Sequence, residues 1–395
     1  MKKVISLLSV CAVLLGMAAC SNDVFEDEFV DKSSGAQTRA AAVAPETSTL
    51  AYIMSEGDWY SKVMGSISKF DPSTQTITKG YFKTVNGVDL GDTGNEMVLY
   101  NGKIYCLVSG HDLTSNNGGL WVIDPATCQA TTKTMIQYDD PKQTGYKAMP
   151  RHMAFDGGKI YISLYSGAVI SVNIDEPQTV VGKKILPAKF SEGICVVEDM
   201  VYVCNSGKEN DTMAGEGNTI SYFATNAMDG TSQNVSTMTS ALNPKLIKYS
   251  ENTGCFYYNA LGQGAMNTSL HYFTDAAKGY STISGAKASD FDLTDSDIYT
   301  VDVDWDEYET NMSRISLATN EVDKYEFDNE TPSFFGLSVK YHNGRLYVGE
   351  SMAPRMFVFE EEDIKETTEN TPIVLKYLYD VNTGVSNINT VVFVD

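Results

Sequence analysis

Asn101-Gly102-Lys103-Ile104-Tyr105 is the stretch that decides the fold, because its pattern recurs along the chain. Asn-Gly flanked by apolar runs is the strongest short-range signal of a β-hairpin. In each later copy a turn is followed by an apolar residue and a tyrosine, and these copies end at Tyr161, Tyr202, Tyr257, Tyr299 and Tyr347. Tyr52 begins the series without a preceding turn. Successive tyrosines lie 41 to 56 residues apart. One four-stranded propeller blade takes about 40–50 residues, so the pattern predicts seven blades.

The rest of each unit supports an all-β protein. Runs rich in Val, Ile and Tyr flank the turns, and no long helical period with caps occurs after residue 47. A pair of β-sandwiches would not explain seven similar units. The chain ends in a lone apolar strand, 388–394, and its first unit starts at a second strand. We therefore predict a seven-bladed β-propeller over residues 48–395, closed by pairing of 386–394 with 50–55 in one blade.

The N-terminal residues predict export. Residues 1–19 combine a basic start with an apolar run too short to span a bilayer, which is typical of a signal peptide. Met17-Ala18-Ala19-Cys20 resembles a bacterial lipobox, in which Cys20 is lipidated; an ordinary cleavage site is the alternative. Residues 20–47 are acidic and then small and polar, so we expect a flexible tether.

Charge limits the partners of the protein. The formal net charge is −22, without a basic footprint for nucleic acid or anionic lipid. We therefore expect contact with a membrane only through the lipid anchor. The acidic cluster at residues 23–28 resembles the signal that sends Bacteroidetes lipoproteins to the outer face of the outer membrane. A solvated linker without an address is the alternative.

The cysteines give a register prediction. With Asp199-Met200 as a two-residue turn, Cys195 and Cys204 would lie directly opposite each other on one hairpin. We expect the two thiols to be in contact, and both a disulfide and a pair of free thiols remain open. Nothing in the cysteine and histidine spacing supports a structural zinc site.

Two short segments carry a family resemblance. Residues 55–59 (Ser-Glu-Gly-Asp-Trp) and 89–97 (Asp-Leu-Gly-Asp-Thr-Gly-Asn-Glu-Met) resemble segments of the YncE-like, DUF5074-type propellers of Bacteroidetes surface lipoproteins. Ser55 departs from the usual Asn of that pattern. The BtuG-type members of this group capture cobalamin for a TonB-dependent outer-membrane transporter. The resemblance therefore implies a non-enzymatic, cobalamin-binding lipoprotein of the cell surface, with no cofactor.

Strand direction predicts where a ligand would bind. The starts of the innermost strands and the ends of the second strands should meet at one rim, around a central channel. The candidate ligand-binding residues on this rim are Glu56, Trp59, Tyr60, Asp92, Glu96, His111, Arg151, His152, Trp305, Phe334, Phe335, Arg355 and Asn389. We also expect Lys147, Tyr165, Glu192, Lys208, Lys245, Asp304, Tyr308 and Glu350 there. The aromatic residues could cover apolar faces of cobalamin, the carboxylates could accept its amide protons, and the basic residues could meet its phosphate.

Other functions stay open beside cobalamin capture. The bulky ligand could instead be a siderophore, or the propeller could bind a protein or a glycan. His111 and His152 fall on the rim in neighbouring units and could form an acid/base pair, as in propeller lactonases and lyases. Residues 302–307 invite a calcium interpretation, but Glu307 stands where an EF-hand loop needs glycine, and a solvated acidic loop is the simpler interpretation.

Overall fold

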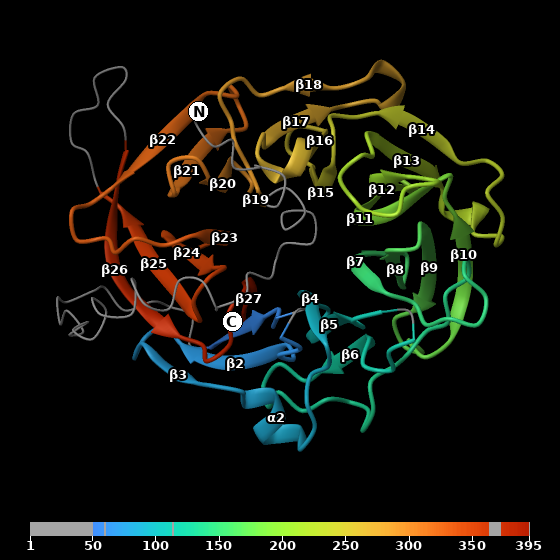
Figure 1. Ribbon diagram of the computed structural model, residues 1–395, viewed down its shortest axis with the longest axis horizontal. Helices are drawn as coiled ribbons and strands as arrows, with labels where there is room; N and C mark the ends of the chain where they lie inside the picture. Colours follow the sequence, from blue (N-terminus) through green and yellow to red (C-terminus); the bar gives the residue numbers. More distant parts are fainter. Residues whose placement is uncertain (1–49, 59–60, 113, 363–372, 395) are drawn as a thin grey trace, which may run out of the picture.

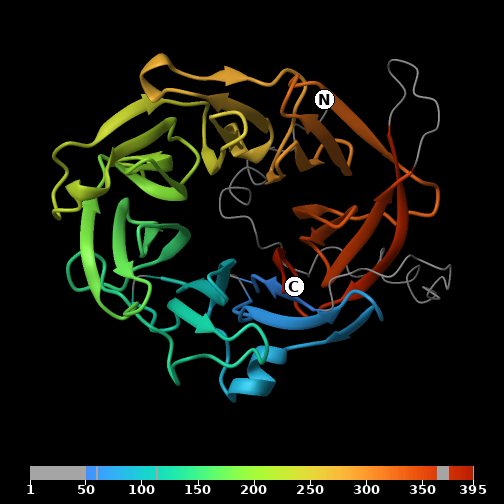
Figure 2. The same ribbon diagram turned by 180° about the vertical axis from the view of Figure 1, so that it is seen from behind.

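The computed structural model describes residues 50–58, 61–112, 114–362 and 373–394, and these residues form a propeller-like ring of β-sheets (Figures 1 and 2). Residues 1–47, with the predicted signal peptide, Cys20 and tether, lie outside the described ranges, as do Trp59 and Tyr60. None of the helices within those ranges is long and apolar enough to cross a bilayer.

The described residues form six sheets, of which five are antiparallel and have three or four strands. The first sheet consists of β27 (Ile388–Phe393), β1 (Ala51–Ser55), β2 (Ser66–Asp71) and β3 (Thr76–Thr78), and the second of β4 (Thr93–Tyr100), β5 (Lys103–Ser109) and β6 (Gly119–Ile123). The third consists of β7 (Pro150–Asp156), β8 (Lys159–Leu164), β9 (Ala168–Asn173) and β10 (Val180–Ile185), and the fourth of β11 (Ala188–Val197), β12 (Met200–Lys208), β13 (Thr219–Ala224) and β14 (Ser236–Thr239). The fifth consists of β15 (Pro244–Ser250), β16 (Cys255–Ala260), β17 (Ser269–Phe273) and β18 (Ser281–Thr282). In the three-stranded sheet, isolated bridges to Ala130 and Ile136 take the place of a fourth strand.

The sixth sheet has eight strands. Its antiparallel halves are β19 (Asp290–Leu293), β20 (Asp297–Asp304), β21 (Glu309–Ser316) and β22 (Val322–Phe327), and β23 (Gly336–His342), β24 (Arg345–Glu350), β25 (Arg355–Glu361) and β26 (Ile373–Asn382). β22 and β26 pair in parallel, from Tyr325 opposite Ile373 to Phe327 opposite Leu375. The expected seven separate blades are therefore not all present as separate sheets, because hydrogen bonds join the outer edges of the last two four-stranded units.

Within the described residues helices are few and short. α2 (Tyr81–Asn86) follows β3, and three single-turn 3-10 helices, η3 (Thr225–Ala227), η4 (Gln263–Ala265) and η5 (Ala276–Lys278), lie in loops. The prediction of an all-β protein is confirmed.

The innermost strands hold the ring together. β27, β4, β7, β11, β15, β19 and β23 contact one another in that order, and β23 returns to β27 (Figure 1). The hydrophobic core is divided among the spaces between neighbouring sheets. One such cluster joins Tyr105 and Leu107 of β5 to Ile160 and Ile162 of β8. Each sheet therefore depends on its two neighbours for burial.

The predicted pairing of the chain ends is confirmed. β1 pairs with β27 in antiparallel register, from Ala51 opposite Phe393 to Ser55 opposite Ile388. On its other edge β1 pairs with β2. The C-terminal strand thus supplies the innermost strand of the first sheet.

The predicted register of Cys195 and Cys204 is wrong. The turn is Glu198-Asp199, both with left-handed φ (49° and 62°), so Cys195 lies opposite Tyr202. A turn placed one residue earlier shifts every partner on the hairpin. Both cysteines are free thiols.

The thiols give a simple test. Alkylation of the unfolded protein without reductant should label both Cys195 and Cys204, because neither thiol is oxidised in the structure. Peptide mass mapping would show the labels. An unlabelled pair that becomes reactive only after reduction would contradict the observed register.

Candidate functional site

Most of the innermost strands have a β-bulge near their start. The register shifts after Gly94 in β4, Pro150 in β7, Ser191 in β11 and Pro244 in β15. A bulge leaves residues unpaired and redirects their side chains. β23 and the β1–β27 pair have the same shift. We call the polar residues within these bulges the bulge ring; they are Asn95, Arg151, His152, Glu192, Lys245 and Asn389.

Arg151 ties three sheets together in this ring. Its Nε donates to Glu192 Oε2 at 3.0 Å and its Nη1 donates to Asn95 Oδ1 at 3.0 Å. The guanidinium carbon lies 5.2 Å from the ring centroid of Tyr165. The Glu192 side chain is only 8% exposed, so this ion pair is largely withdrawn from water. The arrangement holds Arg151 in one orientation.

His152 lies between two carboxylates. Its Nδ1 is 3.1 Å from Glu96 Oε1, and its Nε2 is 3.9 Å from Glu192 Oε2. Glu96 also accepts from the backbone N–H of Met153 at 2.7 Å. Glu96 therefore orients the imidazole and leaves Nε2 toward Glu192.

Glu56 belongs to the same centre. Its N–H donates to the carbonyl of Asn387 at 2.7 Å, and its own carbonyl accepts from Gly94 N at 3.2 Å. Burial raises the pKa of the Glu56 carboxyl to about 7, against the opposing charges of Arg151 and Lys245. The site therefore contains a carboxyl group that exchanges a proton near neutral pH.

Asn389 links the chain end to this centre. Its Nδ2 donates to the carbonyls of Gly94 and Asn95, at 2.6 and 3.2 Å. The bulge in β27 and the bulge in β4 are thus hydrogen-bonded to each other across two sheets.

Asp92 organises a loop at the rim. Its carboxylate accepts from the backbone N–H of His111 at 3.0 Å, from Ser115 Oγ at 2.6 Å and from Asn117 Nδ2 at 3.0 Å. The His111 ring lies beside the same carboxylate, 3.4 Å away. The His111 and His152 rings therefore lie beside different carboxylates, Asp92 and Glu96.

Aromatic residues lie at another part of the rim. Trp305 stacks on Phe335, with centroids 5.7 Å apart and planes 7° from parallel, and both side chains are partly exposed. The expectation that Phe334 reaches the rim is wrong. Phe334 is 5% exposed and packs against Phe357 and Phe359 in the core.

The guanidinium of Arg355 is hydrogen-bonded to other groups of the protein. Its Nε donates to Glu350 Oε2 at 2.9 Å, and its Nη2 donates to the carbonyl of Ser333 at 3.4 Å. Burial raises the pKa of Glu350 to about 7, although Arg355 opposes the shift. Both rim arginines named from the sequence thus have buried carboxylate partners.

The carboxylates of Asp302 and Asp304 accept hydrogen bonds from different parts of the chain. Asp302 is buried and accepts from Thr268 Oγ1 at 2.7 Å, while Asp304 accepts from the N–H groups of Asp306 and Glu307. Among the described residues no group of three or more acidic, His or Cys side chains is placed to hold a metal ion.

Two residues of the site were missed from the sequence. Asn95 lies in the segment quoted for the family resemblance, but only the bulge shows that it faces Arg151. Phe190 contacts the Tyr165 ring edge-on, with centroids 4.8 Å apart. Its position at the start of an innermost strand was an available signal.

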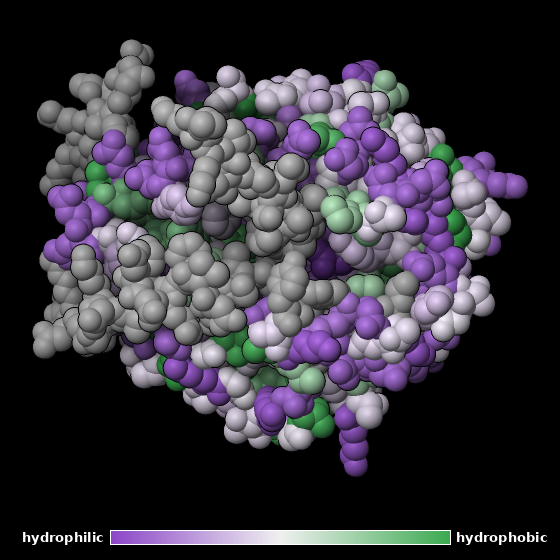
Figure 3. Space-filling model, viewed as in Figure 1, coloured by the Kyte–Doolittle hydropathy of each residue, from purple (hydrophilic) through white to green (hydrophobic). Residues whose placement is uncertain are grey.

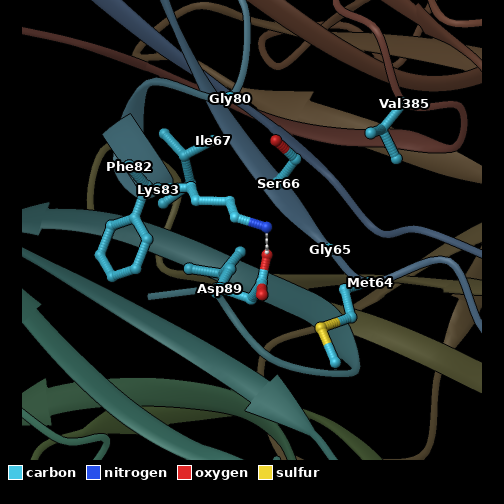
Figure 4. A pocket seen from close by; sticks show the side chains of 10 residues that line it. Met64, Gly65, Ser66, Ile67, Gly80, Phe82, Lys83, Asp89 and Val385 are labelled. Atoms are coloured by element: carbon cyan, nitrogen blue, oxygen red, sulfur yellow. Dashed lines mark ion pairs between the residues drawn. The ribbon is translucent and has the colours of Figure 1, made fainter. Parts of the chain in front are cut away.

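A pocket of about 360 Å³ lies beside α2 (Figure 4). Met64, Phe82 and Val385 contribute apolar lining, and Lys83 pairs with Asp89 at 2.7 Å on its wall (Figure 4). None of the candidate ligand-binding residues lines it.

The surface around the ring is mostly hydrophilic on one face, with scattered hydrophobic residues (Figure 3). Most of the exposed large hydrophobic residues of the described chain lie in loops between the strands: Val63, Met64, Val88, Tyr146, Met213, Met266 and Tyr308. Apolar side chains are therefore exposed mainly in these connecting loops.

Comparisons with known proteins identify relatives in fold. No curated protein matches the sequence. Among solved structures, a proposed 6-phosphogluconolactonase from Bacteroides fragilis superposes with a TM-score of 0.58 at 12% identity, covering 89% of this chain and all of its own. A second, from Bacteroides uniformis, gives a TM-score of 0.56 at 12% identity, covering 88% of this chain and all of its own. At this identity the likeness shows the fold alone. Residues 51–222, which include Glu56 and most of the bulge ring, match the family described as a domain of unknown function, DUF5074.

Proposed function

We propose that this protein is a cell-surface lipoprotein that captures cobalamin on the rim and passes it to a TonB-dependent outer-membrane transporter. The observation that supports this best is the bulge ring, where several sheets hold polar side chains at fixed positions. The Trp305–Phe335 stack adds an aromatic platform on the same rim. A preordered site of this kind loses little entropy on binding, which favours tight capture of a bulky ligand.

We further propose that the eight-stranded sheet represents two blades, which makes seven in all. Each half has its own innermost strand, β19 or β23, and only the outer strands β22 and β26 join them. The seven tyrosines that mark the repeating units in the sequence, from Tyr52 to Tyr347, support the same count.

The ion pairs of Arg151 and Arg355 refine the expected contacts. Both guanidinium groups already have buried carboxylate partners, so neither is freely available for the phosphate of cobalamin. Glu56 and Glu96 can accept hydrogen bonds from the amides of cobalamin, and Lys245, which makes no ion pair within the described ranges, is left for the phosphate.

Titration calorimetry tests this proposal. Cyanocobalamin should bind at micromolar or lower concentration, and Trp305→Ala should weaken binding by about tenfold or more, roughly 1.4 kcal/mol, through loss of stacking. Tyr81→Ala is the control, because Tyr81 belongs to α2, which lies at the outer edge of the ring (Figure 1). Wild-type protein that does not bind cyanocobalamin at micromolar concentration would remove cobalamin as the ligand and favour a siderophore.

A hydrolase is the second candidate. The oriented imidazole of His152, hydrogen-bonded to Glu96, is the arrangement of a general base. The two superposed proteins supply the first substrate to try, 6-phosphogluconolactone. Hydrolysis that is lost in His152→Gln while cyanocobalamin has no effect would favour this candidate over capture.

A further inference from the structure

Two aromatic residues have an unusual backbone conformation. Fourteen non-glycine residues of the described chain have positive φ, and Phe190 (53°) and Tyr308 (57°) are the aromatic ones. Left-handed backbone is tolerated mainly by Gly, Asn and Asp, and bulky residues there are outliers. Both aromatics lie on the rim. Such strain persists only where the surroundings enforce it, and it gathers at functional sites.

Phe190 is enforced by its neighbours. Its N–H donates to the Tyr165 carbonyl at 2.9 Å, and its own carbonyl accepts from Ser206 Oγ at 3.0 Å. Gly207 lies under its ring, where an added Cβ would come within 2.2 Å of Phe190 Cδ2. The ring is therefore fixed beside Tyr165, on which Arg151 rests.

Tyr308 gains little from packing. It ends the tight connection between β20 and β21, directly before the Asp304–Glu309 pair closes the hairpin. The residue is 64% exposed, the highest value among the exposed large hydrophobic residues of the described chain. Glycine is the usual residue at a left-handed position of such a turn. Fold stability therefore does not account for a tyrosine here.

We propose that Phe190 and Tyr308 are ligand-contacting residues that present ring faces to a large, flat, unsaturated ligand. This inference rests on the proposed capture of such a ligand on the rim. β11 and the β20–β21 hairpin belong to units that are separated by the sheet of β15–β18 (Figure 1), so a ligand that touches both residues must span the inner end of that sheet. Trp305, three residues before Tyr308, would share the second contact.

Glycine substitution separates stability from binding. Tyr308→Gly should keep or raise the melting temperature, because it relieves the strain, yet weaken cyanocobalamin binding about tenfold or more. Phe190→Leu should also weaken binding, while keeping apolar volume over Gly207. Asn101→Gly, a left-handed exposed turn residue between β4 and β5, is the matched control and should leave binding unchanged.

The outcomes distinguish the two proposals. Wild-type binding with unchanged affinity in both variants would overturn the inference and leave cobalamin capture standing. A melting temperature clearly lowered by Tyr308→Gly would also overturn it, with or without a ligand, since Tyr308 would then have a structural role. Failure of the wild type to bind cyanocobalamin would overturn the proposed function instead.

Discussion

Removal of residues 385–395 is expected to abolish folding of the ring. β27 is the only described partner of the inner edge of β1, and Ile388, Val391, Val392 and Phe393 are buried. Burial of each such side chain contributes about 1.5–3 kcal/mol. The four together rival the net stability of a typical domain, about 5–15 kcal/mol.

Deletion would also expose the edge of β1, where residues 51–55 are all buried, and such an edge promotes aggregation. Circular dichroism melts and size-exclusion chromatography measure the effect. A variant without residues 1–47 is the control and should melt like wild type. Val391→Asp should be far more destabilising than Thr390→Asp, because Val391 is buried and Thr390 is partly exposed. A truncated protein that melts cooperatively at the wild-type temperature would show that the ring does not need closure.

The sequence was sufficient for the strand pattern but not for every register. A recurring turn followed by an apolar pair predicts a hairpin wherever it occurs. The C-terminal strand was matched with the first unit because that unit lacks an innermost strand of its own. The hairpin of Cys195 shows the limit. Both Glu198-Asp199 and Asp199-Met200 are possible two-residue turns, and the structure uses the first, with both of its residues in left-handed backbone.

The site was predicted by position more than by contact. Arg151 and Glu192 lie near the starts of innermost strands, so strand direction placed both at the rim, but no local signal marks a bulge. Phe334 was misplaced because neighbouring residues of an extended segment point in opposite directions. Phe335 stacks on Trp305, and Phe334 therefore enters the core.

The merged sheet could not be foreseen from the repeats. β22 and β26 are outer strands of consecutive units, and their parallel pairing depends on how closely two sheets approach. Arg314 strengthens the junction, with Nη1 2.9 Å from Glu361 and Nη2 3.2 Å from Asp323. These contacts lie between strands of two different units, and a sequence pattern that marks single strands does not predict which units come into contact.

Arg151→Met is expected to destabilise the protein by about 3–5 kcal/mol, the usual result of removing one partner of a buried ion pair. Glu192, with 8% of its side chain exposed, would lose its 3.0 Å hydrogen bond and retain an uncompensated charge. Asn95 would lose its partner as well. Methionine keeps much of the apolar volume over Tyr165, so the loss is chiefly electrostatic.

A second substitution tests that cause. Arg151→Met combined with Glu192→Gln should recover much of the loss, because the double variant leaves no unpaired charge. Arg314→Met is the matched control: its side chain is 30% exposed and its partner Glu361 is 27% exposed, so solvent screens the pair and the cost should be about 1 kcal/mol or less. Urea denaturation of the four proteins provides the free energies of unfolding. If Arg151→Met costs no more than Arg314→Met, or if Glu192→Gln restores nothing, the bulge ring is not held by a buried ion pair. Its polar groups would then be loosely placed, and the low entropic cost assumed for ligand capture would lose its basis.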